Sequence, residues 1–494
     1  MRILQVAAEV QPFIKTGGLA DVAGALPDAL HALGHDVRVL MPGYGAALER
    51  ARAHGPIETV HAWPNARLLA GRLPGGCIAW FYETPEFTAR GGHPYDRPDA
   101  TPWPDNAQRF AEFSRAAAAL ADDALGLGWR PDVVNAHDWH TALMPVYMML
   151  ARVPAASVFT IHNLAYQGLF EHAWFARLGM PGWLEHWQAL EFRGQLCFMK
   201  GGIGFADKVS TVSQVYADEI RTPAFGEGMD GLLAHRGADL VGIVNGIDTA
   251  AWDPEHDPHI AAAYGPGALE GKAVARAALL EETGLQAGPR TPVLAYVGRL
   301  AEQKGVDLLL GALDDLLRLP AAVIILGAGD PRLAEALREA ARLHPKRLHV
   351  TIGFDEAQAH RIYAGADMLA MPSRFEPCGL GQINAMQYGT IPVVRRTGGL
   401  AETVIDITPE TLADGSATGF VFTDETANAL LGAVQRARRL FLKSRQWRQL
   451  IDNAMARDPS WTRSARRYAE LYRSALGHRR RFLGDAVSPA DEKP

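Results

Sequence analysis

The chain has 494 residues and a formal net charge of −6, with 49 Lys and Arg against 55 Asp and Glu. At roughly 150 residues per domain, this length predicts two large domains or three smaller ones. Apolar residues make up 48% of the chain and charged residues 21%, which excludes intrinsic disorder, collagen and coiled coil. The acidic balance argues against a nucleic-acid partner, because such proteins usually carry a basic excess.

The cysteines and the apolar runs bear on the compartment. The chain has three scattered cysteines, Cys77, Cys197 and Cys378. They are too few for a disulfide framework or a Cys-rich zinc site, and they fit a reducing compartment. The first apolar stretch is shorter than that of a secretory signal peptide, and the charged residues Glu9 and Lys15 follow it. The longest apolar run, 143–151, is too short to span a bilayer. We therefore expect a cytoplasmic protein with no membrane partner.

Short β-rich runs alternate with helix-length segments, a pattern that predicts parallel sheets with helices on both faces. The first series of runs is Ile3–Ala8, Val37–Met41, Val133–Ala136, Ser157–Ile161, Lys208–Val212 and Leu240–Val244. The second is Pro292–Val297, Val323–Leu326, His349–Ile352, Met368–Met371, Pro392–Val394 and Gly419–Phe422. Between the series, Pro, Gly and Asp are frequent, as in an interdomain connection. We predict two doubly wound α/β domains, 1–245 and 246–458, and a disordered tail over 479–494.

Glycine-rich and polar segments follow the predicted strands, where open α/β sheets bind ligands. After the first run comes Lys15-Thr16-Gly17-Gly18-Leu19-Ala20-Asp21. The glycines permit close backbone approach, and the following helix offers free N–H groups to an anion, although such a pair can equally be only a tight turn. Neither a Walker A motif nor G-x-G-x-x-G follows this strand, which disfavours a P-loop or a classical NAD site.

Histidines, acids and amides follow the later strands of the first half. They form the segments His137-Asp138-Trp139-His140, His162-Asn163 and Asn245-Gly246-Ile247-Asp248. The His-x-x-His spacing is compatible with a zinc ligand pair, and also with histidines that cap a helix or hydrogen-bond a loop. No third ligand stands at typical metal spacing, so we expect no metal.

The second half places two cations in one strand-to-helix turn, Arg299 and Lys304. Together they could neutralise a diphosphate without a metal; the alternative is a surface pair beside Glu302. The loop 372–381 then sets the lone carboxylate Glu376 among two prolines and two glycines, before a helix expected over Gln382–Tyr388.

Cys378 in this loop could act as a nucleophile or as a packing residue, and no His stands nearby, which favours packing. Further on, Arg396-Thr397-Gly398-Gly399-Leu400-Ala401-Glu402 repeats the order cation-Thr-Gly-Gly-Leu-Ala-acid of 15–21. The repeat suggests two sites of similar architecture facing each other across a cleft; a chance match is the alternative.

With these motifs the sequence resembles bacterial glycogen synthases, retaining glucosyltransferases of family 5 that are related to plant starch synthases. The matches run in family order over about residues 1–475. They are Lys15–Val22, His137–His140, Ile161–Gly168, Lys200–Ile203, Asn245–Asp248, Gly298–Leu300, Gln303–Gly305, Ser373–Leu380 and Thr397–Leu400.

The resemblance implies a GT-B fold, with two Rossmann-like domains around a deep cleft and a final helix, 459–478, that returns to the N-terminal domain. It implies that glucose passes with retention from ADP-glucose to the non-reducing end of an α-1,4-glucan such as glycogen, without a metal or other cofactor. It says nothing of oligomeric state.

The resemblance also implies site residues. Arg299 and Lys304 would hold the diphosphate, and Glu376 would lie near the transferred glucose. The implied catalytic set is Glu376, Arg299, Lys304 and His162. The implied substrate-binding set is Lys15, Gly17, Gly18, Asp21, Tyr95, Asp138, Asn163, Asn245, Cys378, Gly379, Leu380, Thr397 and Gly398.

Two departures from the wider GT-B pattern are informative. The common E-x7-E motif would place a second acid where this chain has Asn384, a feature that favours glycogen synthases. Gly381 replaces a Thr or Asn and removes one side-chain contact.

A convincing carboxylate nucleophile for double displacement is not identified, so a same-face mechanism is preferred. The rival interpretations are a phosphorylase or sucrose-type synthase, and a non-enzymatic two-lobed sugar-binding protein.

Overall fold

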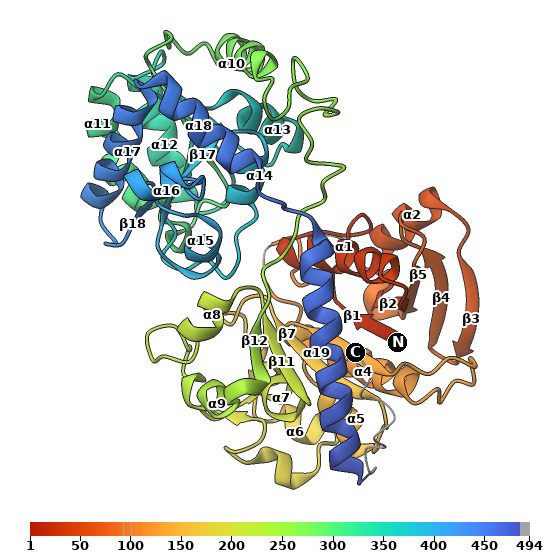
Figure 1. Cartoon of the computed structure of the whole chain (residues 1–494). Helices are drawn as coiled ribbons and strands as arrows, with labels where there is room; N and C mark the ends of the chain where they lie inside the picture. The colour runs from red at the N-terminus through yellow and green to blue at the C-terminus, as the bar shows by residue number, and fades with distance from the viewer. Residues whose placement is uncertain (92, 100, 485–494) are drawn as a thin grey trace. The chain divides into compact units, whose positions relative to one another are not determined.

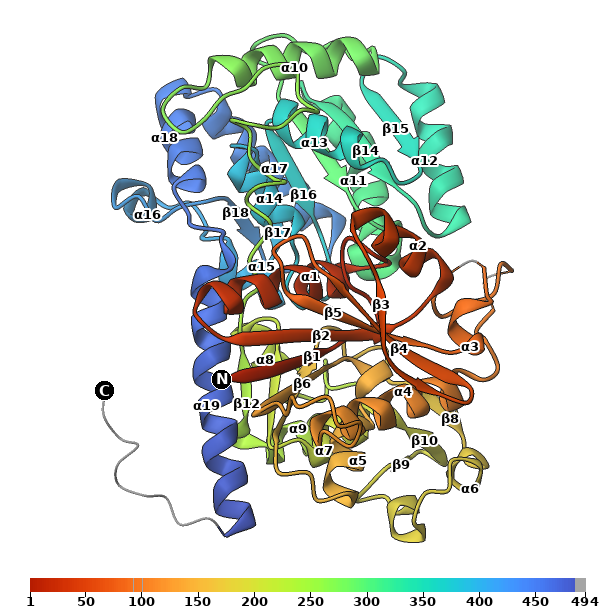
Figure 2. The same cartoon turned by 90° about the vertical axis from the view of Figure 1, so that its right-hand side faces the viewer.

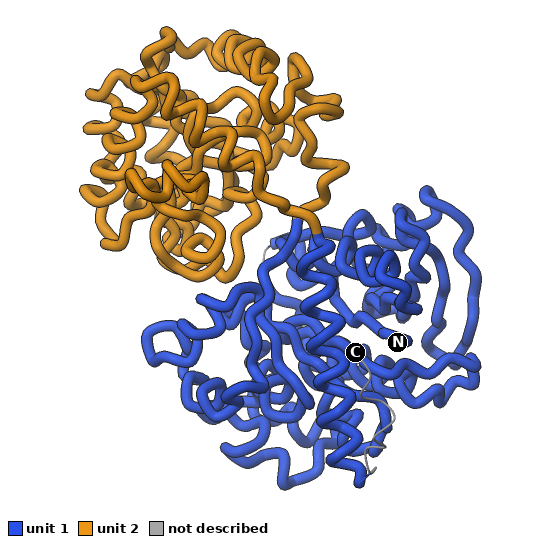
Figure 3. The backbone as a smooth tube through the Cα atoms, viewed as in Figure 1, with its two compact units in different colours: residues 1–246, 461–494 blue, residues 247–460 orange. Residues whose placement is uncertain are grey.

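The chain folds into two compact units in the computed structural model, which describes residues 1–91, 93–99 and 101–484. Unit 1 comprises Met1–Gly246 and Trp461–Pro494, and unit 2 comprises Ile247–Ser460 (Figure 3). Each unit has its own cluster of buried apolar side chains, so each has its own hydrophobic core. Among the described residues, no helix is both long and apolar enough to cross a membrane.

A nine-stranded sheet forms the centre of unit 1 within the described ranges (Figure 1). Its order is β12 (Leu240–Gly242), β11 (Lys208–Thr211), β7 (Ala156–Ile161), β6 (Val133–His137), β1 (Arg2–Val6), β2 (Asp36–Pro42), β5 (Ile78–Glu83), β4 (Ala66–Arg72) and β3 (Glu58–Trp63). Strands β12 to β5 are parallel, and β4 and β3 are antiparallel to their neighbours. Strands β6 and β7 are buried along their whole length, as expected of a parallel sheet covered on both faces.

Helices of unit 1 lie between these strands and cover the sheet. They are α1 (Gly18–Ala32), α2 (Gly45–His54), α3 (Pro85–Thr88), α4 (Asn106–Ala121), η1 (Trp139–Thr141), α5 (Met144–Leu150), α6 (Trp174–Arg177), η2 (Gly182–Glu185), α7 (Phe198–Phe205), α8 (Gln214–Glu219), α9 (Asp230–His235) and η3 (Gly237–Asp239). A small antiparallel sheet joins β8 (Leu169–Glu171), β10 (Gln195–Cys197) and β9 (Glu191–Phe192).

The C-terminal helix α19 (Trp461–Leu483) belongs to unit 1, where it packs along α1, β6 and β7 (Figures 1 and 2). It continues past residue 478 to Leu483, so the prediction of a disordered tail is wrong for 479–483. Buried Arg479 explains the extension, because its guanidinium donates to the carbonyl of Val153 and lies near Asp207. The remaining predicted tail, 485–494, lies outside the described residues.

Unit 2 contains a six-stranded parallel sheet among its described residues, in the order β15 (Leu348–Ile352), β14 (Ala322–Gly327), β13 (Val293–Val297), β16 (Met368–Met371), β17 (Ile391–Arg395) and β18 (Phe420–Phe422). Counted along the chain within this unit, the order is 3-2-1-4-5-6, that of a dinucleotide-binding Rossmann sheet. The order reverses between β13 and β16. In unit 1 it reverses between β1 and β6. Ligands of open α/β sheets bind beyond the carboxyl ends of the strands at such reversals.

The helices of unit 2 connect these strands and follow the last of them. They are α10 (Glu270–Thr283), η4 (Glu302–Lys304), α11 (Val306–Arg318), α12 (Pro331–Leu343), α13 (Glu356–Gly365), α14 (Gly381–Gln387), α15 (Gly398–Thr403), α16 (Pro409–Ala413), α17 (Ala427–Phe441) and α18 (Ser444–Met455). The basic stretch 436–448 spans the end of α17 and the start of α18.

A buried polar cluster anchors the irregular segment that follows the unit boundary. The Asp257 side chain has no exposed surface; its Oδ2 accepts from the Tyr388 hydroxyl at 2.6 Å and lies 2.7 Å from Nδ1 of His360. Trp252 stacks on His360 with ring centroids 3.9 Å apart. Burial opposes ionisation of Asp257, but hydrogen bonds from Tyr388, the His259 backbone and His360 outweigh it and lower its pKa.

We predict that Asp257→Ala lowers the free energy of unfolding by about 3 kcal/mol, because it leaves buried polar partners unpaired. The contribution of Asp257 is fully present above the pKa of an unfolded Asp and is lost as pH falls through its lower folded pKa. Urea unfolding at pH 7 measures the cost. Asp253→Ala is the control, since Asp253 pairs with the exposed His256, and a change within about 0.5 kcal/mol is expected. Equal costs for both variants would contradict the prediction.

Candidate functional site

Two loops meet where the strand order of unit 2 reverses, one after β13 and one after β16. The Gln303 side chain donates from Nε2 to the carbonyl of Phe375 at 3.1 Å, and the Arg374 backbone N–H donates to the carbonyl of Gln303 at 2.8 Å. Nζ of Lys304 lies 2.6 Å from Oε2 of Glu376. The predicted catalytic residues Lys304 and Glu376 are therefore an ion pair.

The two side chains of this ion pair differ in their exposure to solvent. The Glu376 side chain is 6% exposed and that of Lys304 is 23% exposed, so the acid is inside and the cation is toward solvent. Ser373 donates from its hydroxyl to the same Oε2 at 3.1 Å. Lys304 pairs with Glu376 and not with Glu302, whose carboxylate lies 4.0 Å from Arg332.

Arg299 lies at the end of the same strand and is exposed. Its guanidinium donates to Oε1 of Gln303 at 2.8 Å, and its carbonyl accepts from the Tyr296 hydroxyl at 2.8 Å. Arg374, by contrast, is held in ion pairs with Asp307 and Glu425. Arg299 and Lys304 are thus brought into one turn as predicted, and Arg374 serves the structure of the loop.

The glycines after β17 are required by packing. Gly398 has φ 43°, and a Cβ there would lie 2.0 Å from the carbonyl oxygen of Glu376. The backbone N–H of Gly399 donates to that same oxygen at 3.0 Å. Thr397, just before them, is the residue that precedes α15. The Thr397–Gly399 segment therefore supports the backbone of Glu376.

The remaining predicted residues of this loop lead into α14. Cys378 is buried, and its carbonyl accepts from Nε2 of Gln382 at 3.0 Å, in keeping with a packing role. Gly379 has φ 71°, a left-handed conformation that favours glycine, and Leu380 precedes the first residue of the helix. Asn384 is buried in α14, and within the described chain its Oδ1 has no hydrogen-bond partner.

In unit 1, buried Glu9 organises the loop that follows β1. Its carboxylate accepts from the backbone N–H of Thr16 at 2.5 Å and of Gly17 at 3.2 Å, and from the hydroxyls of Thr16 and Tyr95. Burial and then the Glu9 carboxylate raise the pKa of Tyr95 well above its ordinary value. Nζ of Lys15 lies 2.7 Å from Oδ1 of Asp21. Lys15, Gly17, Asp21 and Tyr95 are thus brought together.

Gly17 and Gly18 have no packing reason to be glycine. A Cβ on either would meet no heavy atom within 4 Å, and the φ of −157° at Gly17 is extended backbone open to any residue. This contrasts with Gly398, whose sequence surroundings are alike. The open space beside Gly17 and Gly18 suits the close approach of a ligand to the backbone.

Asp138 and His162 meet beyond the ends of the neighbouring strands β6 and β7. Oδ1 of Asp138 accepts from the backbone N–H of His162 at 2.7 Å and of Asn163 at 3.4 Å. Burial raises the pKa of Asp138 to about 7, against the effect of these hydrogen bonds. Asp138 has φ 56°, a strained conformation for a non-glycine residue and one found at functional sites.

The two histidines of His-x-x-His face different partners. Nδ1 of His137 lies 2.8 Å from Nε2 of His162, whereas His140 stacks on Tyr95 with ring centroids 4.3 Å apart. Asn245 is buried after β12, and Oδ1 of its side chain has no hydrogen-bond partner in the part of the chain that the structure describes.

Sequence reasoning missed several residues of these sites. The sequence pattern marks Glu9 only as a charge after the first apolar run, although an acid just beyond a buried strand is itself a signal. Ser373 and Gln303 are hydrogen-bonding residues of the loops that no spacing rule singled out. Gln5 and Tyr472 are buried beside His137, and Tyr472 lies 335 positions further along the chain than His137, so no local pattern could find it.

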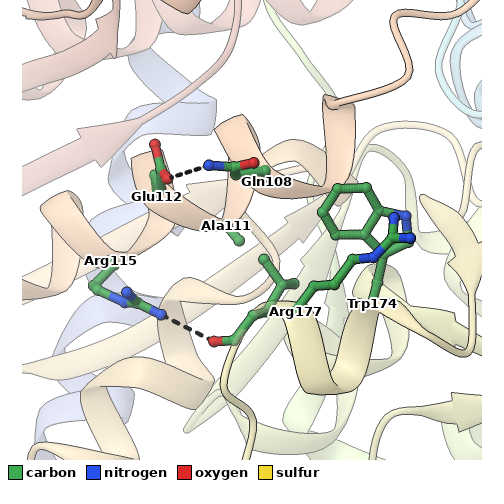
Figure 4. Close-up of a pocket in the computed structure, with 7 residues that line it drawn as sticks. Gln108, Ala111, Glu112, Arg115, Trp174 and Arg177 are labelled. Carbon is green, nitrogen blue, oxygen red and sulfur yellow. Dashed lines mark hydrogen bonds between the residues drawn. The ribbon is translucent and has the colours of Figure 1, made fainter.

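A surface pocket of about 350 Å³ lies between α4 and α6 of unit 1 (Figure 4). It is lined by Gln108, Ala111, Glu112, Arg115, Trp174, Arg177 and Leu178. None of the predicted site residues lines it, and it does not enter the chemistry below.

Comparison with known proteins follows the same two units. The starch synthase catalytic domain model matches residues 2–235, and the glycosyl transferases group 1 model matches residues 283–454. Glycogen synthase 1 of Methylococcus capsulatus is 52% identical over 96% of this chain and 97% of its own length. Glycogen synthase of Thioalkalivibrio sulfidiphilus is 47% identical over 96% of this chain and 100% of its own.

Two solved structures resemble the fold. The catalytic domain of starch synthase IV from Arabidopsis thaliana, bound to ADP and acarbose, superposes with a TM-score of 0.86 at 32% identity, over 96% of this chain and 99% of that one. Sucrose-phosphate synthase from Thermosynechococcus elongatus has a TM-score of 0.60 at 18% identity over the same shares, which shows a shared fold alone.

Two Rossmann-like units, matched by these two models, define a glycosyltransferase of the GT-B fold. The chain belongs to the glycogen and starch synthase family. It is an enzyme that joins glucosyl units from a nucleotide-sugar donor to a glucan acceptor. The family, fold class and glycogen synthase activity predicted from the sequence are confirmed.

We predict that Asp138→Asn stabilises the protein while lowering its activity. The Asp138 carboxyl is harder to ionise when folded, so its burial costs stability above pH 7 and costs nothing below about pH 4. The variant should gain about 2 kcal/mol at pH 8, and the gain should vanish as pH falls through 7 toward 4. Thermal unfolding at pH 8 and pH 5 measures it.

Asp99→Asn is the matched control, for which we expect a change in stability of opposite sign. The hydroxyl and backbone N–H of Thr101 lower the pKa of the exposed Asp99, so this variant should lose stability at neutral pH. A gain for Asp138→Asn that is the same at both pH values would contradict the assignment.

Proposed function

We propose that this glycogen synthase uses ADP-glucose as its donor and transfers glucose with retention to the non-reducing end of an α-1,4-glucan, releasing ADP. The observation that carries the proposal is the Arg299 and Lys304 pair beside buried Glu376, at the reversal of strand order in unit 2. The plant starch synthase with a TM-score of 0.86 is bound to ADP and acarbose, which supports ADP as the nucleotide.

The cations at this turn can neutralise the negative charge that the reaction places on the leaving group. When the bond between C1 of glucose and the phosphate oxygen breaks, negative charge develops on the leaving ADP. Nζ of Lys304 uses one of its three N–H donors on Glu376 and keeps two for a phosphate. The Arg299 guanidinium adds a planar fork suited to phosphate oxygens. Two such donors stabilise the leaving diphosphate, so we propose that no metal and no other cofactor is needed.

Glu376 has a role near the sugar. Its Oε2 already accepts from Lys304 and Ser373, which favours a fixed electrostatic group over a nucleophile that must swing to C1. In our proposal retention therefore follows a same-face route. The acceptor hydroxyl bonds to C1 on the face that ADP leaves, and a leaving phosphate oxygen takes the hydroxyl proton.

Unit 1 supplies polar groups for sugar and nucleotide hydroxyls in this proposal. His162, Asp138 and Asn163 form one connected group, and Lys15, Asp21 and Tyr95 form a second around Glu9. The buried, unpaired Oδ1 of Asn245 is a further acceptor among the described residues. We propose the cytoplasm as the place of action, supported by three buried cysteine thiols.

Initial rates with labelled ADP-glucose and UDP-glucose on glycogen, each with and without EDTA, test the donor and the metal. We expect the rate with ADP-glucose to exceed that with UDP-glucose at least tenfold, with no effect of EDTA. The new linkage should be cleaved by an α-1,4-specific glucosidase. A UDP-glucose preference, loss of rate in EDTA or a β-linked product would each overturn the corresponding part.

We predict that Lys304→Met lowers kcat by about 10²- to 10³-fold, because one donor to the leaving phosphate is lost. Thermal unfolding shows whether the variant is folded, since Glu376 loses its cation. Arg338→Met is the control, because Arg338 forms an exposed ion pair with Glu335 on α12, and the kcat of this variant should be unchanged. Near-normal turnover of folded Lys304→Met would contradict the diphosphate assignment.

A further inference from the structure

A row of buried polar side chains crosses the sheet of unit 1 and ends at His162. Gln5 on β1, Asn135 and His137 on β6, and Tyr472 on α19 all have no exposed surface. Nδ1 of His137 lies 2.8 Å from Nε2 of His162, and Nε2 of His137 lies 2.8 Å from Oε1 of Gln5. Such groups are costly to bury unless every donor meets an acceptor.

The Tyr472 hydroxyl determines which way the two amides point. It lies 2.9 Å from the Gln5 amide and 3.0 Å from the Asn135 amide, and the two amides lie 3.2 Å apart. A phenol has one proton and cannot donate to two carbonyl oxygens, so at least one of the two amides presents an N–H group to it. Turning only one amide would set two donors or two acceptors against each other. The Asn135 orientation also lets its Oδ1 accept from Thr160 at 2.9 Å.

This orientation determines the proton positions on both histidines. Oε1 of Gln5 is an acceptor, so Nε2 of His137 carries the proton. Burial, together with the neighbouring His162, lowers the pKa of His137 well below its ordinary value, and burial lowers that of His162 to about 3, so both rings are neutral. Nδ1 of His137 is then bare, and Nε2 of His162 must donate to it. Nδ1 of His162 is left without a proton.

We infer that Tyr472 and Gln5, acting through His137, hold His162 in the tautomer whose Nδ1 accepts a hydrogen bond from a substrate hydroxyl. Among the described residues no hydrogen-bond partner lies on that nitrogen, and the His162 side chain is only partly buried. A sugar offers hydroxyl donors, and a bare imidazole nitrogen accepts one; a protonated nitrogen would instead meet a hydroxyl as a second donor. Gln5, His137 and Tyr472 are positioning residues, and this inference rests on the proposed role of His162.

The tautomer can be read directly in the full-length protein. We would label histidine with ¹⁵N and assign His162 by its disappearance in His162→Gln. The expected spectrum shows a protonated Nε2 and an unprotonated Nδ1 on His162. The opposite tautomer, or a charged ring at pH 7, would overturn the inference. This readout needs no catalysis, so it stands even if His162→Ala proves fully active, a result that would instead contradict the proposed function.

Steady-state kinetics then test whether the hydrogen bond between His137 and His162 affects the reaction. His137→Leu should lower kcat/KM for the donor by about 10- to 100-fold, the range for loss of a residue that orients a histidine. His137→Asn is the matched variant, since its Oδ1 can replace Nδ1 as acceptor, and it should stay within about fivefold of the wild type. In a His162→Ala background, His137→Leu should have no further effect. Full additivity of the two losses would show a merely structural role and overturn the inference.

Tyr472→Phe tests the part assigned to α19. Without the hydroxyl, the Gln5 amide can turn, and a second set of His162 ¹⁵N signals from the other tautomer should appear, with kcat/KM reduced severalfold. An unchanged single tautomer in the folded variant would contradict the role of Tyr472.

Discussion

Parallel strands bring all their carboxyl ends to one edge of a sheet, and a reversal of strand order leaves an opening between two neighbouring loops at that edge. Both units of this glycosyltransferase depend on that constraint. In unit 2 the reversal lies between β13 and β16, and the loops on its two sides supply Lys304 and Glu376. In unit 1 it lies between β1 and β6, whose following loops supply Glu9 and Asp138. The strand order of the two sheets therefore decides which loops, and which of their polar residues, lie next to each other.

Similar sequence does not mean a similar use of glycine. The segments 15–21 and 396–402 share their order of residue types, and both lie where a strand passes into a helix. Gly398 is glycine because the carbonyl of Glu376 fills the place of a side chain, whereas the space beside Gly17 is open. One segment supports the backbone of the loop that holds Glu376, and the other leaves open space beside its own backbone.

A row of buried polar side chains is unusual in a parallel sheet, whose interior positions are normally filled by aliphatic side chains. Here Gln5, Asn135 and His137 occupy such positions, and each of their polar groups finds a partner. The last helix of the chain supplies the phenol that completes the row. Because α19 packs on β6 and β7, residues from the two ends of the chain meet in the core of unit 1.

The sequence by itself determined the class and the chemistry. Alternating β-rich and helical stretches indicate doubly wound domains. Apart from β5, the parallel strands of the two large sheets lie where apolar runs predict them, because strands buried on both faces must be apolar throughout. Strands β3, β4 and β5 of unit 1 are not among the predicted runs, and the largely exposed β3 lacks that apolar signal. Local motifs also selected Arg299, Lys304, Glu376 and His162 as candidates, since these residues lie in segments that follow strands.

Only the tertiary structure decided how those residues are paired. Lys304 and Glu376 are 72 positions apart, and no spacing rule states that they form an ion pair. Glu9 binds the hydroxyl of Tyr95 across 86 positions, and Tyr472 reaches Gln5 across 467. Such contacts follow from which strands lie side by side and which helix packs on them. Residue type and local pattern specify each group, and chain folding over long separations specifies its partner.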